Sequence, residues 1–99
     1  MKVYVIAEIA SNWEGNLVKA KRLIRECKNA GVDAVKFQMW RANDLYSQEH
    51  SQWKIIKKSE LTFKKAEKIK KYADEQNIEF FCSVFYPEGV DYLESLGVK

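Results

Sequence analysis

The sequence predicts an α/β fold built of parallel β/α units, equivalent to the N-terminal portion of a TIM (β/α)8 barrel. Three runs rich in β-branched and apolar residues, 3–10, 34–40 and 78–85, alternate with segments of helical periodicity. Each run is almost continuously apolar, as in strands that are covered on both faces of a parallel sheet. A complete barrel needs about 250 residues. The 99 residues therefore exclude a whole barrel, and we expect one partial-barrel domain over 1–99.

The composition is that of a globular chain, with 46% hydrophobic and 31% charged residues. A net charge of +3 is compatible with an anionic ligand, but it does not by itself indicate nucleic-acid binding. No apolar run approaches the roughly 20 residues of a membrane span. Glu8 interrupts the apolar start of the chain, which lacks the features of a signal peptide. We therefore expect a cytoplasmic protein with no membrane partner, in which Cys27 and Cys82 are reduced, packed thiols.

The first β/α unit is marked by its loop and its caps. The apolar run 3–10 gives way to a polar loop at 11–15, and Asn16 then occupies the position of a helix N-cap. Gly31 is placed to end this helix in the left-handed conformation. The inner face of the predicted helix carries apolar residues at helical spacing: Leu17, Ala20, Ile24 and Cys27.

The second and third strands are joined by another long helix. Residues 63–76 have helical periodicity, with Thr62 as the expected N-cap and Asn77 in the capping role that Gly31 has in the first helix. A last short helix is expected to start at Pro87, because proline suits a first turn, and to stop at Gly97.

The alternation calls for a fourth strand where the sequence stops, at Val98 and Lys99. Three parallel strands can bury helices on one face, but their outer edges and the other face stay open. We interpret the chain as the front portion of a larger barrel. A small open α/β sandwich is the competing structure.

Residues 41–61 form an insertion between the second strand and the following helix. It is much longer than the roughly two to six residues usual at such a connection. We expect residues 51–58 to form a helical turn or two, with Trp53 and Ile56 on one side and Ile55 as a further candidate. Insertions after the C-terminal end of a strand are where α/β enzymes place binding elements.

Polar side chains gather on one face of the predicted sheet. Side chains alternate along a strand, so the uniformly apolar faces of the three runs should pack against the helices. The other face carries polar residues near the C-terminal ends of the strands: Glu8, Lys36, Gln38 and Ser83.

Glu8 and Lys36 are the strongest candidates for chemistry. They lie on consecutive strands, which are usually neighbours in this topology, and an ionised side chain within an apolar strand is costly unless it is paired. The pair could be purely structural, a salt bridge that closes a barrel interior. It could also form the floor of a polar pocket, with Lys36 holding a phosphate or carboxylate and Glu8 orienting or protonating a substrate oxygen.

Other candidates are weaker. His50 has no cluster of metal ligands around it, so we expect a surface role and no metal ligands in this chain. Trp13, Trp40 and Trp53 either stack on a ligand or pack under the loops. Lysines between 54 and 71 form a cationic stretch without any nucleic-acid motif, so we expect a solvated helix face and no nucleic-acid partner. Dinucleotide-binding, P-loop and nucleophile-elbow motifs are absent from the sequence.

Two motifs resemble a known family. Residues 6–12, IAEIASN, followed by Gly15 and Asn16, look like an opening I-A-E-I-G-x-N-H-x-G loop, and residues 30–38, AGVDAVKFQ, closely match an A-G-A-D-A-V-K-F-Q strand. Further matching segments follow in the expected order, at 42–45, 60–61 and 78–85. Along essentially its whole length the chain resembles the N-acetylneuraminate (sialic acid) synthase family, which includes synthases of bacterial nonulosonic acids and spore-coat polysaccharide enzymes.

The resemblance implies condensation of phosphoenolpyruvate with N-acetylmannosamine or a similar amino sugar, with release of phosphate. A divalent ion, Mn²⁺ or Mg²⁺, is expected for the family and polarises the sugar aldehyde. By motif position, Glu8 matches the active-site glutamate and Lys36 the phosphoenolpyruvate-binding lysine. Gln38 matches a sugar-contacting glutamine, Ser83 a hydroxyl that contacts the phosphate, and Asn12 a further substrate-binding residue.

The sequence departs from the family pattern at several positions. Trp13 and Glu14 replace the histidine of the first loop and its neighbour, Ala10 replaces a glycine, and Tyr86 stands where an aspartate commonly precedes the third helix. The family's second lysine, its metal-binding histidines and its C-terminal antifreeze-like domain would follow Lys99. We therefore expect part of a site that is inactive alone and that works with the rest of the barrel or another copy, as a homo-oligomer. The alternative is a non-catalytic partial barrel that self-assembles or complements a partner.

Overall fold

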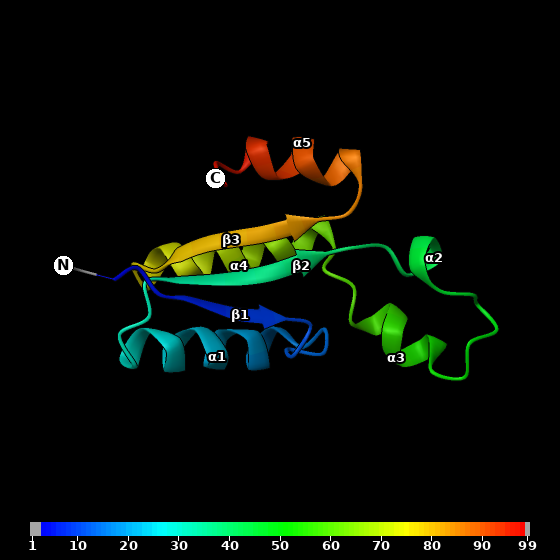
Figure 1. The fold of residues 1–99 in the computed structure, drawn as a ribbon, viewed down its shortest axis with the longest axis horizontal. Helices are drawn as coiled ribbons and strands as arrows, with labels where there is room; N and C mark the ends of the chain where they lie inside the picture. Colours follow the sequence, from blue (N-terminus) through cyan, green and yellow to red (C-terminus); the bar gives the residue numbers. More distant parts are fainter. Residues whose placement is uncertain (1–2, 99) are drawn as a thin grey trace.

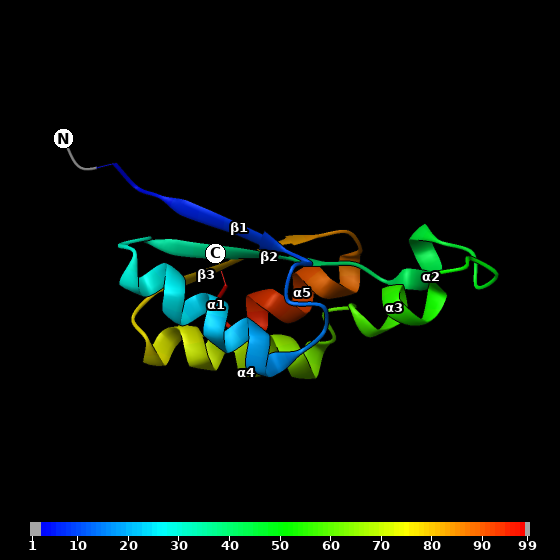
Figure 2. The same ribbon diagram turned by 90° about the horizontal axis from the view of Figure 1, so that it is seen from below.

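The structure, a computed structural model, describes residues 3–98. Its sheet is made of parallel strands in sequence order: β1 (Ile6–Ala10), β2 (Ala34–Met39) and β3 (Glu79–Val84). Three longer helices accompany the strands (Figure 1): α1 (Leu17–Asn29), α4 (Phe63–Glu75) and α5 (Pro87–Ser95). All three lie on one side of the sheet (Figure 2). The predicted parallel β/α architecture is confirmed. Within the described range, no helix is long and apolar enough to cross a membrane.

The predicted helix caps are confirmed. Asn16 and Thr62 begin α1 and α4, and each side chain accepts a hydrogen bond from the backbone N–H three residues later, at 3.1 and 3.2 Å respectively. Just beyond the three longer helices the chain turns through the left-handed region, with φ of 84° at Gly31, 55° at Asn77 and 79° at Gly97. Local chemistry therefore sets where these helices begin and end.

The strands are shorter than the apolar runs that predicted them. β1 begins at Ile6, because the N–H of Val5 is already satisfied by the Asp33 carboxylate at 2.8 Å. Trp40 and Phe85 lie just past the ends of β2 and β3. They extend the apolar pattern past the paired residues, although the Phe85 N–H still donates to the Met39 carbonyl at 3.0 Å. Both place large side chains at the C-terminal edge of the sheet.

The core lies between the sheet and the helices, which Figure 2 shows on a single side of the strands. The largest side chains with essentially no exposed surface are Trp13, Ile24, Val35, Phe37, Met39, Leu61 and Ile69. Three of these alternate along β2, so the predicted apolar face of that strand packs on the helices. Alternation then turns Lys36 and Gln38 to the face that carries no helix.

Residues 41–61 leave the C-terminal end of β2 and project beyond the sheet (Figure 1). We call this segment the α2–α3 excursion, because it contains α2 (Ala42–Leu45), which was not predicted, and α3 (Trp53–Lys58), which falls within the predicted range. In α3 Trp53 and Ile56 are half-buried, whereas Ile55 is 62% exposed.

Candidate active site

The register of the sheet places the predicted polar residues together. Glu8 on β1 pairs with Lys36 on β2, and Gln38 on β2 pairs with Ser83 on β3. Paired residues of neighbouring strands point to the same face. All four side chains therefore lie on the face without helices, in two layers, with Gln38 and Ser83 nearer the C-terminal edge. Their arrangement agrees with the strand alternation, and their chemical roles stay predictions.

This polar face is open in the described part of the chain. Glu8 is exposed, and Lys36, Gln38 and Ser83 are half-buried. Among residues 3–98, no salt bridge joins Glu8 to Lys36. The purely structural interpretation, in which the two charges satisfy each other, is thus not what the structure shows. Both charges are available to a group from outside this sheet.

Ala10 ends β1 in a strained backbone conformation. Its φ is 51°, and the pairing with β2 becomes irregular between Glu8 and Ala10. Glycine adopts this left-handed region without steric cost, whereas alanine does not. The left-handed φ of Ala10 is therefore a physical reason to expect glycine at this position of the motif.

The loop after β1 turns its tryptophan into the core. Trp13 is completely buried, and its ring meets Phe37 edge-on with 6.1 Å between the ring centres. Packing under the loop is therefore correct for Trp13, and ligand stacking is wrong. Glu14 instead pairs with Lys19 at 2.6 Å, which lowers the pKa of that carboxyl. Asn12 is exposed in the turn, where it stays a candidate substrate contact.

A cavity of about 310 Å³ opens at the C-terminal ends of the strands, which we call the strand-end cavity. Gln38 lines it from β2, and Ser11 and Phe85 line it from the positions just past β1 and β3. Its other walls come mostly from the α2–α3 excursion: Trp40, Leu45, Tyr46, Ile55, Ile56 and Ser59. The sequence indicated Gln38 as a site residue but not Ser11 or Phe85. The available signal was their position, because Ser11 directly follows the predicted strand 3–10 and Phe85 is the last residue of the predicted strand 78–85.

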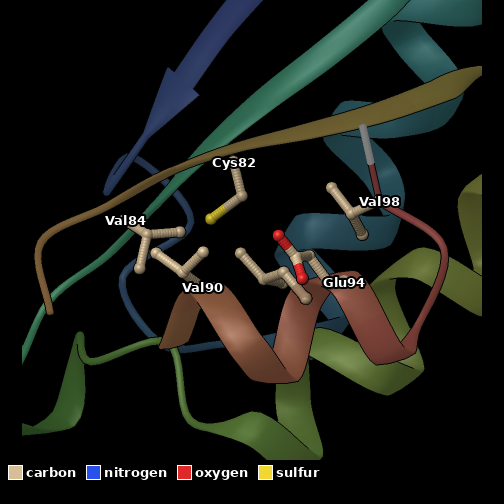
Figure 3. A pocket seen from close by; sticks show the side chains of 6 residues that line it. Cys82, Val84, Val90, Glu94 and Val98 are labelled. Atoms are coloured by element: carbon tan, nitrogen blue, oxygen red, sulfur yellow. The ribbon is translucent and has the colours of Figure 1, made fainter. Parts of the chain in front are cut away.

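A second cavity, of about 340 Å³, lies on the helix side of the sheet between β3 and α5 (Figure 3). The Cys82 thiol points into it among valine side chains and Glu94. Burial raises the pKa of Cys82 to about 12, with a further rise from the Glu8 carboxylate and a smaller opposing effect of Lys36. The thiol is therefore protonated at neutral pH and is not a nucleophile. Cys27 is also free, as expected for both cysteines.

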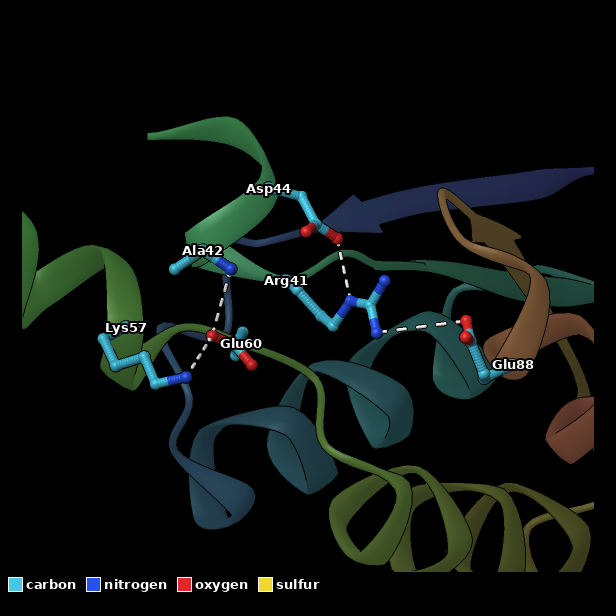
Figure 4. A network of polar contacts seen from close by, with 6 residues as sticks. All are labelled: Arg41, Ala42, Asp44, Lys57, Glu60 and Glu88. Atoms are coloured by element: carbon cyan, nitrogen blue, oxygen red, sulfur yellow. Dashed lines mark hydrogen bonds and ion pairs between the residues drawn. The ribbon is translucent and has the colours of Figure 1, made fainter. Parts of the chain in front are cut away.

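Glu60 fixes the start of the α2–α3 excursion to its end (Figure 4). Its Oε2 accepts a hydrogen bond from the Ala42 N–H at 3.1 Å and lies 2.9 Å from Lys57 Nζ. The side chain of Glu60 is only 12% exposed. One buried carboxylate thus binds the first turn of α2 and the last turn of α3.

Arg41 ties the same excursion to α5 (Figure 4). Its Nε donates to the Asp44 carboxylate at 2.8 Å, and its guanidinium lies 4.1 Å from the centre of the Tyr86 ring. Its other contact, with Glu88, is longer at 3.9 Å. The Tyr86 side chain makes no capping hydrogen bond to α5. Its ring instead packs against the Arg41 guanidinium in a cation–π contact.

The described residues do not supply a metal centre by themselves. Between residues 3 and 98, no group of three or more His, Cys, Asp and Glu side chains could hold an ion. His50 lies on the α2–α3 excursion, where its Nδ1 accepts a hydrogen bond from the Gln52 N–H at 3.0 Å. This donor set does not fit the divalent ion expected from the resemblance.

The NeuB family profile matches residues 23–99. The N,N'-diacetyllegionaminic acid synthase of Legionella pneumophila is 32% identical, with 100% of this chain and 32% of that protein covered. Human N-acetylneuraminate-9-phosphate synthase is 32% identical, with 96% of this chain and 30% of that protein covered. The chain thus spans about a third of the length of the curated relatives it matches.

Solved structures show the same fold. The N-acetylneuraminic acid (sialic acid) synthetase of Leptospira borgpetersenii superimposes with a TM-score of 0.89 at 28% identity, covering 99% of this chain and 34% of that one. The spore coat polysaccharide biosynthesis protein SpsE of Bacillus subtilis gives 0.74 at 31% identity, covering 97% of this chain and 27% of that one. The expected fold, parallel β/α units equivalent to the N-terminal portion of a TIM barrel, is therefore confirmed over the alternative of a separate open sandwich.

Proposed function

This chain belongs to the NeuB family, and on that premise we propose that it takes part in condensing phosphoenolpyruvate with N-acetylmannosamine or a related amino sugar. The products are a nonulosonic (sialic) acid and phosphate. One observation carries the proposal: the Glu8–Lys36 register pair on the helix-free face, one layer below Gln38 and Ser83. Barrel enzymes bind their substrates at this end of the strands.

The four side chains divide the chemistry between the two substrates. The Lys36 ammonium binds the anionic groups of phosphoenolpyruvate, and the Ser83 hydroxyl donates to a phosphate oxygen. C3 of phosphoenolpyruvate then attacks the aldehyde carbon of the open-chain sugar, and the aldehyde oxygen takes up a proton that Glu8 supplies or directs. Water adds at C2 and phosphate leaves, while Lys36 stabilises the developing charge. Gln38 contacts the sugar, and Asn12 is a further contact from the loop.

We propose that the described residues are one part of a composite site. They offer two charged groups and no donor set for the expected Mn²⁺ or Mg²⁺. Further barrel elements or another copy would then complete the site, and the chain alone would be inactive. The free thiols of Cys27 and Cys82 support a cytoplasmic location, where such cysteines stay reduced.

Binding of phosphoenolpyruvate tests the proposal without requiring turnover. We expect Lys36→Met to weaken binding by calorimetry at least about tenfold, because a charge-assisted hydrogen bond contributes about 1.5–3 kcal/mol. The matched control is Lys64→Met, at an exposed lysine of α4 on the opposite side of the sheet. Equal affinity of both variants would contradict the role of Lys36. Phosphate release by the chain alone, with N-acetylmannosamine and Mn²⁺, would overturn its inactivity.

A second candidate is a non-catalytic partial barrel that assembles with another copy or a partner. The observation that favours it is the exposure of large apolar side chains at the open side of the sheet. Ile6 is 48% exposed on the same face as Glu8, and Phe85 at the end of β3 is 55% exposed. The oligomeric state of the chain in solution discriminates this candidate from a monomeric fragment.

A further inference from the structure

Two helices on the outer side of the sheet concentrate the positive charge of the chain. α1 has five Lys and Arg residues against one Glu, and α4 has five Lys residues against three Asp and Glu. By contrast, α5 has three carboxylates and no Lys or Arg. The cationic stretch between 54 and 71 therefore continues onto α1, which precedes it in the sequence by more than one strand.

On each of the two helices, three cations follow the spacing i, i+4 and i+7, which sets side chains in a row along one face. We call these six residues the basic stripe: Lys21, Arg25 and Lys28 on α1, and Lys64, Lys68 and Lys71 on α4. All six are exposed, and within residues 3–98 none of them forms an ion pair. Two carboxylates of α4 are engaged elsewhere, Asp74 by Lys70 at 2.8 Å and Glu67 by the Tyr92 hydroxyl at 3.3 Å. The charge of the stripe is therefore left for a group from outside these residues.

The two rows join into one line, because α1 and α4 pack side by side and run in the same direction (Figure 2). Three contacts fix their alignment: Lys65 Nζ to the Gly15 carbonyl at 3.1 Å, Lys21 Nζ to the centre of the Tyr72 ring at 5.5 Å, and Lys28 Nζ to the Asn77 carbonyl at 3.1 Å. The partners are 49–51 positions apart in each contact, so Lys71 lies level with Lys21. The α4 row thus precedes the α1 row along the helix axes, and the stripe runs diagonally across the seam for about 20 Å.

The spacing of the stripe fits a helix better than an extended chain. Its cations recur every three or four residues, an interval of about 5 Å along the axis, which is close to one helical turn. Side chains on one face of an extended segment are about 6.6–7 Å apart. A helix laid across the seam at about 20°, a common packing angle, would follow the diagonal.

Two other kinds of anionic partner find less support on this surface. Single-stranded nucleic acid stacks its bases on exposed aromatic rings, but both aromatic residues of α1 and α4, Phe63 and Tyr72, are half-buried. A bilayer surface is bound by inserting apolar side chains. On these two helices, all of whose residues are described, Val18 is the one large apolar side chain that is exposed.

We propose that the basic stripe docks an acidic helix of a partner protein, with carboxylates at i, i+4, i+7, i+11 and i+14 on one face. This series repeats the spacing of the stripe, in which Lys21 and Lys71 share one level. The stripe lies on the helix side of the sheet, whereas Glu8 and Lys36 lie on the helix-free face, so the docking is independent of the proposed function.

A pair of model peptides tests the proposal on the whole chain. Both are alanine-based helices of about 20 residues with five glutamates. One peptide carries them on one face at the spacing of the series, and the other spreads them around the helix. We expect the one-faced peptide to bind at least about tenfold tighter by fluorescence anisotropy at about 150 mM salt, because the spread peptide forms fewer ion pairs at once. This comparison needs no protein variant.

Charge reversals locate the contact. Arg25→Glu and Lys68→Glu are at exposed positions without ion pairs, so the fold should persist. Each should weaken the one-faced peptide at least about threefold, since an attraction becomes a repulsion. Lys54→Glu, an equal change of net charge at an exposed residue of α3, is the control and should have little effect. In ¹⁵N spectra the peptide should shift α1 and α4 amides, and saturating phosphoenolpyruvate should not displace it.

Several results would overturn the proposal. These are equal affinity for the two peptides, an equal effect of Lys54→Glu, or peptide shifts on the strands around Lys36. Tighter binding of a DNA duplex or of phosphatidylserine vesicles than of the one-faced peptide, at the same salt concentration, would assign the stripe to that partner instead. None of these results bears on phosphoenolpyruvate binding, which is measured separately with Lys36→Met.

Discussion

Ala10 is a residue whose side chain does not suit its backbone. A φ of 51° destabilises an L-residue by roughly 1–2 kcal/mol, whereas glycine adopts this conformation without that penalty. Ala10→Gly should therefore raise the free energy of unfolding by about 0.5–1 kcal/mol, after the greater flexibility of glycine in the unfolded chain is subtracted. Urea denaturation followed by tryptophan fluorescence measures the difference.

Ala30→Gly is the matched control for that substitution. Ala30 is exposed at the end of α1 with an ordinary φ of −81°, so glycine there gains nothing and should lower stability by about 0.5–1 kcal/mol. The backbone explanation is contradicted if the two variants change stability in the same direction.

Single residues were predictable from sequence where their role is local. Asn16 and Thr62 cap helices through bonds that span three positions, so the residue type and its place before a periodic segment are sufficient. Trp13 was ambiguous, because only the folded loop shows that the indole turns toward Phe37. Ser11 was missed, since a serine in a loop carries no signal until the strand ends are known to converge on a cavity.

At the scale of elements, the two helices of the α2–α3 excursion are stabilised by tertiary contacts more than by intrinsic helix propensity. Its two helices have four and six residues, too short to be stable on their own. The sequence predicted the insertion from its length and α3 from its apolar spacing. It did not predict α2, because a single turn leaves no periodicity to detect. The strands were predictable from their nearly continuous apolar runs, and the longer helices from the residues that mark their ends, with helical periodicity in α1 and α4.

Glu60 makes the contacts that hold α2 and α3 together. Glu60→Ala should cost about 1–3 kcal/mol, because it leaves the Ala42 N–H and the Lys57 ammonium without their partner. Hydrogen exchange should show faster exchange of the α2 and α3 amides, with α1 and α4 unchanged. Glu60→Gln keeps an oxygen acceptor for Ala42 and should lose less.

Glu26→Ala is the control, at an exposed glutamate of α1 away from the excursion. It should change stability by no more than about 0.5 kcal/mol. Uniform loss of protection across all helices in Glu60→Ala would contradict a local role, since it would indicate global destabilisation instead.

At the scale of the whole molecule, the sheet formed by residues 3–98 has helices on one face, and none of these described residues forms a helix on the other (Figure 2). In a closed barrel the second face is the interior, and both edge strands are paired. Here β1 and β3 are edges, and exposed apolar side chains such as Ile6 accompany the Glu8 and Lys36 charges. The sequence predicted this open face from strand alternation. It did not predict which element or molecule packs against the face, because the pattern of these strands describes only the strands themselves.

A second copy of the chain is chemically suited to pack against this open face. Glu8 and Lys36 lie side by side, so a two-fold axis through the face places each carboxylate opposite the ammonium of the other copy. We therefore expect concentration-dependent dimers by light scattering. Glu8→Lys and Lys36→Glu should each weaken dimerisation about tenfold or more through like-charge repulsion, and the double exchange should restore it. Glu26→Lys, on the helix side, should have little effect. A folded chain that stays monomeric at every concentration, or a double exchange that restores nothing, would exclude this mode of assembly.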